Sequence, residues 1–153
     1  MSSSSSIASR HRCMTTPLSI RFDPAVLAQL RRRASTETGA NTSALAQRLI
    51  DEGLRMADHP GIVFKPGPSG RRAALAYGPD VWEIVKFLRE IDERGPAALA
   101  AAAEVFALDV NRISTAVSYY GDYRDEIEAE IEAAEEASVR AEQAWRAQQQ
   151  LIA

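Results

Sequence analysis

The sequence predicts a mainly helical protein of two dissimilar parts, and three observations indicate this fold class. Glycine and proline are scarce, at 8 and 7 of 153 residues, whereas alanine and other helix-favouring residues are abundant. Over most of the chain, apolar residues recur every three to four positions, as on the buried side of a helix. Two short stretches depart from this period, because residues 17–22 alternate with period two and residues 62–76 are typical of a β-hairpin.

Composition excludes several classes of protein. The longest apolar run, residues 97–103, is too short to span a bilayer, and residues 1–12 lack the apolar core of a secretory signal. The single cysteine, Cys13, cannot form an internal disulfide, so we expect a cytoplasmic protein that does not enter a membrane. Residues 1–14 are predicted to be a disordered, serine-rich arm, of which residues 1–13 are dispensable, with Met14 as an alternative start.

The net charge of −3 conceals a gradient along the chain. Residues 1–56 hold eight arginines against four acids, a surplus of +4. Residues 57–120 have a net charge of −1, and residues 121–153 have a net charge of −6. This gradient predicts a polyanionic partner for the front and a different, basic partner for the back, although solvated helix faces of varying sign would give the same pattern.

Residues 15–57 are predicted to form one strand and two helices. The apolar face of the strand holds Leu18, Ile20 and Phe22. Its outward face holds Pro17, Ser19 and Arg21. Asp23 followed by Pro24 is a typical helix start, and the first helix is expected to bury Val26, Leu27, Leu30 and Ala34 and to stop at Gly39. Asn41 is expected to cap the second helix, whose apolar side holds Leu45, Leu49, Ile50 and Leu54.

A unit this small needs a second copy of itself. A lone strand leaves its backbone donors and acceptors unpaired, and about 40 residues bury too little surface to be stable alone. Both problems disappear if two copies pair their strands antiparallel about a two-fold axis. The predicted dimer core consists of Leu18, Ile20, Phe22, Leu45 and Leu49. The two-stranded ribbon then fits the major groove of B-DNA, where arginine donates two hydrogen bonds to guanine and serine is an adaptable partner.

The order of strand, proline, helix, Gly-x-Asn-Thr-Ser and helix resembles the ribbon-helix-helix (CopG/Arc-like) family of repressors and antitoxins, and GANTSALAQRLI is similar to its loop and second-helix start. The resemblance implies a swapped-strand dimer that reads operator DNA, with a phosphate clamped by backbone amides at the start of the second helix. The implied DNA-binding residues are Pro17, Ser19, Arg21, Asn41, Thr42 and Ser43. Pro17 departs from the pattern, since that position more often holds a polar residue. The alternative is a ribbon that only dimerises, with Arg21 as a solvated charge.

A break at residues 58–61 introduces a second domain, predicted to span residues 58–121. After the β-hairpin, Asp80 is expected to start a helix that ends at Gly95, and Pro96 a short alanine-rich helix that ends near Phe106. The next helix, from Asp109 to Gly121, is expected to bury Val110, Ile113, Val117 and Tyr120. Its start, with Asn111, Arg112 and Thr115, either contacts DNA or packs against a partner, and the lack of a basic surplus favours packing.

Residues 122–153 are predicted to form one acidic C-terminal helix. Asp122 and Asp125 are expected to cap its start. Acids occupy its other faces, while a 4-3 repeat runs along one side through Ile127, Ile131, Ala134, Ala141 and Trp145. This helix either lies on a basic partner surface or is an ordinary solvated helix.

The segment HPGIVF…GPDVWEIVKFL…ALDVNRISTAVSYYGDYRDEIEAEI, within residues 59–131, resembles a small family of helix-turn-helix domains found beside PIN-like nuclease toxins. The resemblance implies a protein that neutralises a PIN-like RNase encoded beside it. The predicted function is therefore a DNA-binding antitoxin of a type II toxin-antitoxin module that represses its own operon. The alternatives are a stand-alone ribbon-helix-helix transcriptional regulator and a dimeric interaction protein that does not bind DNA.

Catalysis is not predicted. The two histidines, His11 and His59, have no ligand partner at useful spacing, so no metal site is expected. Cys13 has no structured base near it, which weighs against a nucleophilic mechanism. Acid pairs such as Glu128 and Glu132 are typical of a solvated helix face. We therefore expect a protein that is not an enzyme and uses no cofactor.

Overall fold

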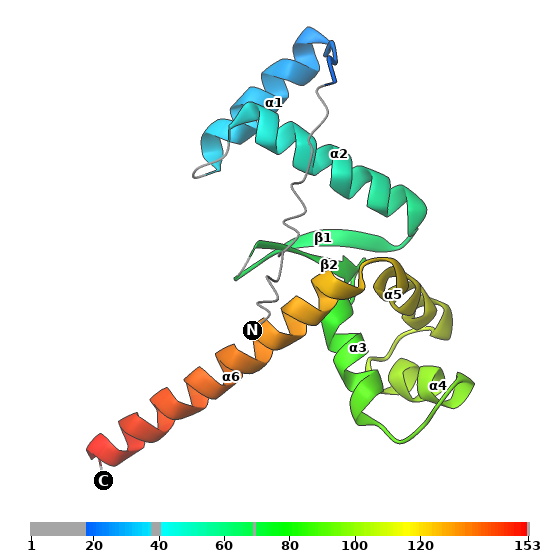
Figure 1. The fold of residues 1–153 in the computed structure, drawn as a ribbon, viewed down its shortest axis with the longest axis vertical. Coiled ribbons are helices and arrows are strands. Elements are labelled where there is room, and N and C mark those ends of the chain that lie inside the picture. Colours follow the sequence, from blue (N-terminus) through cyan, green and yellow to red (C-terminus); the bar gives the residue numbers. More distant parts are fainter. Residues whose placement is uncertain (1–17, 38–40, 69, 153) are drawn as a thin grey trace, which may run out of the picture. The chain divides into compact units, whose positions relative to one another are not determined.

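The computed structural model describes residues 18–37, 41–68 and 70–152, and is mainly helical with one small antiparallel sheet, as the sequence predicts (Figure 1). By internal contacts the chain divides into two compact units, Met1–Leu45 and Ala46–Ala153. The predictions for residues 1–13, Pro17 and Gly39 lie outside the described residues. No helix in the described ranges is long and apolar enough to cross a membrane.

Two side-chain caps start the first two helices. Helix α1, Pro24–Thr36, begins after Asp23, whose carboxylate accepts a hydrogen bond from the amide of Ala25 at 2.8 Å. Helix α2, Thr42–Asp58, begins after Asn41, whose side-chain oxygen accepts from the amide of Ala44 at 2.7 Å. Both predicted helix starts are confirmed.

Most of the apolar side chains of the N-terminal segment are open in the single chain. Residues 18–22 have no regular secondary structure, and Leu18, Ile20 and Phe22 are 80%, 50% and 38% exposed. In the helices, Ala34 and Leu45 are buried and Leu49 is half-buried. The predicted strand therefore has an apolar row that the described part of one chain covers only in part.

The predicted β-hairpin is confirmed. Strand β1, Ile62–Gly67, pairs antiparallel with strand β2, Gly70–Leu75, in a register that places Ile62 opposite Leu75 and Gly67 opposite Gly70. Gly70 has a φ of +126°, which a residue with a side chain rarely adopts, so the hairpin depends on glycine at this position.

Four helices follow the hairpin: α3, Val81–Glu90; α4, Pro96–Val105; α5, Val110–Asp122; and α6, Arg124–Ile152. A capping box formed by Asp80 and Glu83 starts α3, in which the Glu83 carboxylate accepts from the amide of Asp80 at 2.8 Å. Helix α3 ends at Glu90 and not at the predicted Gly95, because Ile91 adopts an extended backbone. Helix α5 continues through the predicted stop at Gly121 as far as Asp122.

The core of the C-terminal unit lies between the hairpin and helices α3, α4 and α5, with the first turns of α6. Ile113, Ala116 and Tyr119 are the buried residues of α5, whereas Val110 and Val117 are 42% and 37% exposed. The buried side of α5 is therefore rotated from the predicted one. Helix α5 contacts α3, α4, α6 and both strands, and the small Ala116 lets such neighbours approach closely, so the tertiary partners decide which side is buried.

We expect Ile113→Ala to destabilise the C-terminal unit by about 2–5 kcal/mol, because it opens a cavity at a fully buried position. Val117→Ala, on the exposed side of the same helix, is the control and should cost less than about 1 kcal/mol. Urea unfolding of both variants measures the difference. A larger loss of stability for the Val117 variant would mean that Val117 lies on the buried side of α5, as the sequence pattern predicted.

Candidate nucleic-acid interface and partner surface

Arg21 and Ser19, the predicted base readers within the described residues, are both exposed on the segment that leads into α1. Asp23, two residues after Arg21, is used as the cap of α1. The exposed residues at the start of α2 are Asn41 and Ser43, with Thr42 half-buried. Because the Asn41 Oδ1 atom caps its own helix, this residue can offer a phosphate its backbone amide and the N–H groups of its side-chain Nδ2.

The two compact units carry opposite net charge. Residues 1–45 hold six arginines against two acids, a net charge of +4, and residues 46–153 hold twelve basic residues against nineteen acids, a net charge of −7. In the first unit, Arg21, Arg31 and Arg32 are exposed, and Arg33 lies 3.7 Å from Glu37. The positive surplus of the chain is therefore concentrated in the first unit and the negative surplus in the second.

A polar cluster around Arg55 joins three helices of the C-terminal unit. The Arg55 guanidinium, on α2, donates to the Tyr119 hydroxyl at 3.0 Å and to Glu126 at 2.7 Å, and lies 4.3 Å from the centre of the Tyr123 ring. Burial by itself would lower the pKa of Arg55, but the hydrogen bonds to Glu126 and Tyr119 outweigh it and raise the pKa. Burial raises the pKa of Tyr119 well above its ordinary value. Both groups therefore keep their protons, and the cluster is structural.

Two further polar contacts hold the same region together. Glu52, a buried residue of α2, accepts two hydrogen bonds from Arg71 of β2, at 2.5 and 3.0 Å. His59 is also buried, and its Nε2 lies 3.0 Å from the Asp122 carboxylate. Asp122 thus contacts His59, in a different role from the predicted cap of α6. The last turns of α2 belong by these contacts to the C-terminal unit, although the sequence placed all of residues 15–57 in the first domain.

The sequence pattern alone did not reveal this cluster. His59 follows the last residue of α2, Asp58, but it is four residues from Arg55 and its amide still bonds to the Arg55 carbonyl at 2.9 Å. That spacing was a usable signal that the two side chains lie on the same side. The identity of the partners, on α5 and α6, depends on contacts more than 60 residues away along the chain.

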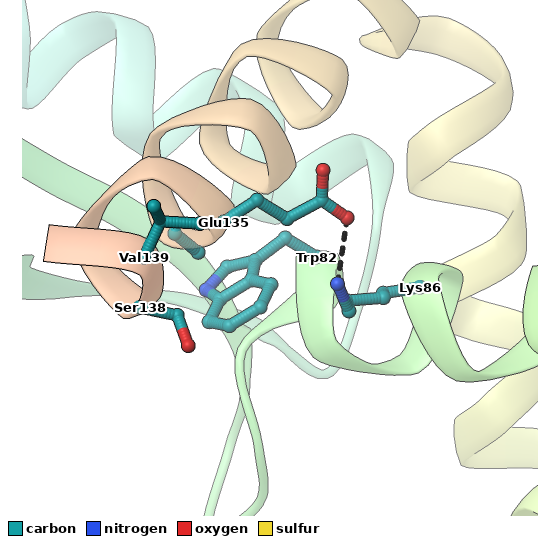
Figure 2. A pocket seen from close by; sticks show the side chains of 6 residues that line it. Trp82, Lys86, Glu135, Ser138 and Val139 are labelled. Carbon is teal, nitrogen blue, oxygen red and sulfur yellow. Dashed lines mark hydrogen bonds and ion pairs between the residues drawn. The ribbon is translucent and has the colours of Figure 1, made fainter. Parts of the chain in front are cut away.

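A groove between α3 and α6 has a mainly apolar lining (Figure 2). Trp82 and Lys86 come from α3, and the residues contributed by α6 are Ala134, Glu135, Ser138 and Val139. Lys86 Nζ lies 2.6 Å from a Glu135 oxygen, as the dashed line in Figure 2 shows, and this contact raises the pKa of Lys86. Trp82 packs against the core but remains half-buried, so its ring is within reach of a partner side chain.

A second groove lies between the hairpin and α6, and it contains a partly buried carboxyl group. Pro68 and Arg72 line it from the hairpin, and Glu130 with alanines and Arg140 line it from α6. One Glu130 oxygen is buried without a hydrogen bond among the described residues. Burial raises the pKa of Glu130 to about 7, nearby Glu126 and Asp80 act in the same direction, and Arg72 opposes them.

Within the described ranges, no group of three or more His, Cys, Asp or Glu side chains could hold a metal ion. Comparison of the chain with family models, with curated proteins and with solved structures finds no match.

Stability should fall as Glu130 ionises. Its folded pKa of about 7 lies above the ordinary 4.5, so the folded state holds this proton more tightly, and the stabilisation present below about pH 4.5 is lost as pH rises through about 7. Because solvent still reaches part of the side chain, we expect a loss of about 1–2 kcal/mol between about pH 5 and about pH 8.

Glu130→Gln should remove that loss, and urea unfolding across the pH range measures it. Glu132→Gln, at an exposed position on the same helix, is the matched control and should keep the slope of the unaltered protein. An unchanged slope in the Glu130 variant would mean that Glu130 ionises as an ordinary surface carboxyl group.

Proposed function

We propose that the protein is a DNA-binding antitoxin of a type II toxin-antitoxin module. Two copies pair through residues 15–57 and read operator DNA, so that the protein represses its own operon. Residues 58–153 bind and neutralise a PIN-like RNase. The observation that carries the proposal is the exposed alternating row of Leu18, Ile20 and Phe22, which adjoins the basic residue Arg21.

The dimer follows from the cost of leaving this row in water. Three large side chains in the five residues 18–22 are partly exposed in the single chain, and the backbone around them has no strand partner within the described residues. Antiparallel pairing with a second copy would satisfy the backbone and bury the row against Leu45 and Leu49. Ser19 and Arg21 would then alternate with the buried residues and face outward.

The two partners follow from the charges. The dimer would present two copies of a +4 unit to the phosphate backbone, and two copies of a −7 unit to a basic protein surface. A stand-alone regulator would lack the second partner, and a dimeric interaction protein would lack the first. Measuring DNA binding and toxin binding separately therefore distinguishes all three functions.

Arg21→Ala should weaken binding of the full chain to a duplex from its own upstream region. We expect a loss of about 1–3 kcal/mol for each lost bidentate contact with guanine, in both half-sites, without loss of the dimer. Arg32→Ala removes the same charge from an exposed position of α1 and should cost less. Fluorescence anisotropy at fixed salt measures both affinities. Equal losses for the two variants would reduce Arg21 to a nonspecific phosphate contact.

The full chain should co-purify with the product of the adjacent reading frame and inhibit its RNase activity. A cut at residue 58 would separate Arg55 and Glu52 from Glu126 and Arg71, so the intact chain is the correct reagent. An Arg21→Ala variant is the control and should still bind the toxin. Lack of any complex, with operator binding intact, would favour the stand-alone regulator.

A further inference from the structure

Helix α6 continues far beyond the core that holds its start. It has 29 residues, or about 44 Å of helix at 1.5 Å per residue. Ile127 and Ile131 are buried, residues 133 and 134 are half-buried, and residues 135–152 are exposed. In Figure 1 this half is the orange-to-red end of α6. A solvated helix of about five turns is marginal in water, which makes an unpartnered face on it informative.

The exposed half carries a largely apolar face. The 4-3 repeat that enters the core at Ile127 and Ile131 goes on through Ala134, Ser138, Ala141 and Trp145, is interrupted by Gln148 and ends at Ile152. Ala137 and Ala144 widen this face on one side. Trp145 and Ile152 are 59% and 76% exposed, so two large apolar side chains of the face lie in solvent. We name residues 134–152 on this side the α6 face.

The α6 face is continuous with the core and begins between two grooves. The groove between α3 and α6, which Trp82 lines, is also lined by Ala134 and Ser138. The groove between the hairpin and α6, which Glu130 lines, is also lined by Ala134 and Ala137. A segment lying along the face would therefore reach both grooves at its inner end. Small residues at the centre of the face let such a segment approach closely, and Trp145 provides an aromatic anchor.

The charges along the edge of the face identify the kind of occupant. Glu135 and Glu142 follow the edge beside Ser138 and Trp145, whereas alanines follow the other edge. An antiparallel second copy would bring the two acidic edges together, and a parallel one would place acids beside alanines. Glu135 has Lys86 and Glu142 has Arg146 as partners, but both pairs are exposed and exchangeable. A segment with basic residues beside its apolar ridge is the better complement.

We infer that the α6 face docks an amphipathic segment of the neutralised toxin, one that presents an apolar ridge flanked by lysine or arginine. The identity of the partner rests on the proposed function, while the position of the contact rests on the exposed repeat and its acidic edge. The toxin would be recognised as a helix is in other complexes, packed along an apolar strip of its partner. In this type of contact the anchoring side chains recur every three to four residues of the helix.

The test uses two full-length variants that add the same charge to opposite sides of α6. Ala141→Glu places a carboxylate in the centre of the face, and Gln143→Glu places one on the opposite side. Both positions are exposed, so both variants should keep the helix content of the unaltered protein by circular dichroism. Isothermal titration with the purified product of the adjacent reading frame, made catalytically inactive, measures the affinity.

We expect Ala141→Glu to weaken toxin binding about tenfold or more and Gln143→Glu to leave it within about twofold. Trp145→Ala should weaken binding in the same manner as Ala141→Glu. Equal affinity of all variants and the unaltered protein would overturn the inference while leaving the proposed function intact. Failure of the unaltered protein to bind would instead overturn the proposed function. Analytical ultracentrifugation measures self-association of the same variants. Loss of self-association in the Ala141 variant but not in the Gln143 variant would make a second copy the occupant and overturn the inference.

Discussion

Burial of Tyr119 sets the arrangement of the C-terminal unit. Its side chain is fully buried, and a buried hydroxyl group needs hydrogen-bond partners, because an unsatisfied one costs several times what the bond contributes. The partners are Arg55, which donates at 3.0 Å, and Glu126, which accepts at 3.1 Å. One lies on α2 and the other on α6, so satisfying a single hydroxyl on α5 holds three helices together.

The same contacts determine where α6 enters and leaves the core. Glu126, Ile127 and Ile131 fix its first turns, and the rest of the helix continues in a direction that its own backbone sets. Arg89 donates to Glu128 and, together with Tyr120, lowers the pKa of that carboxyl to about 2. Residues 135–152 continue beyond these first turns and are exposed.

Two separate units would suit the proposed antitoxin, which would have to recognise two unlike surfaces. DNA would be recognised through positive charge and a few side chains that reach the base edges. A basic RNase would be recognised through apolar contacts framed by acids. The arginine surplus lies in residues 1–45 and the acid surplus in residues 46–153, so each proposed partner has a unit of complementary charge.

The sequence by itself determined the features that depend on near neighbours: the caps at Asp23 and Asn41, and the hairpin that turns at Gly70. These follow from backbone groups a few residues away, so local chemistry suffices. Tertiary packing decided that Ala116 and not Val117 faces the core, and that α5 runs through Gly121, where the Tyr123 amide still bonds to the Tyr119 carbonyl. It also left one buried Glu130 oxygen without a hydrogen bond within the described part of the chain. The apolar residues of a helix are often compatible with burial of more than one of its sides. The elements that pack against the helix, which are distant in sequence, determine which side is buried.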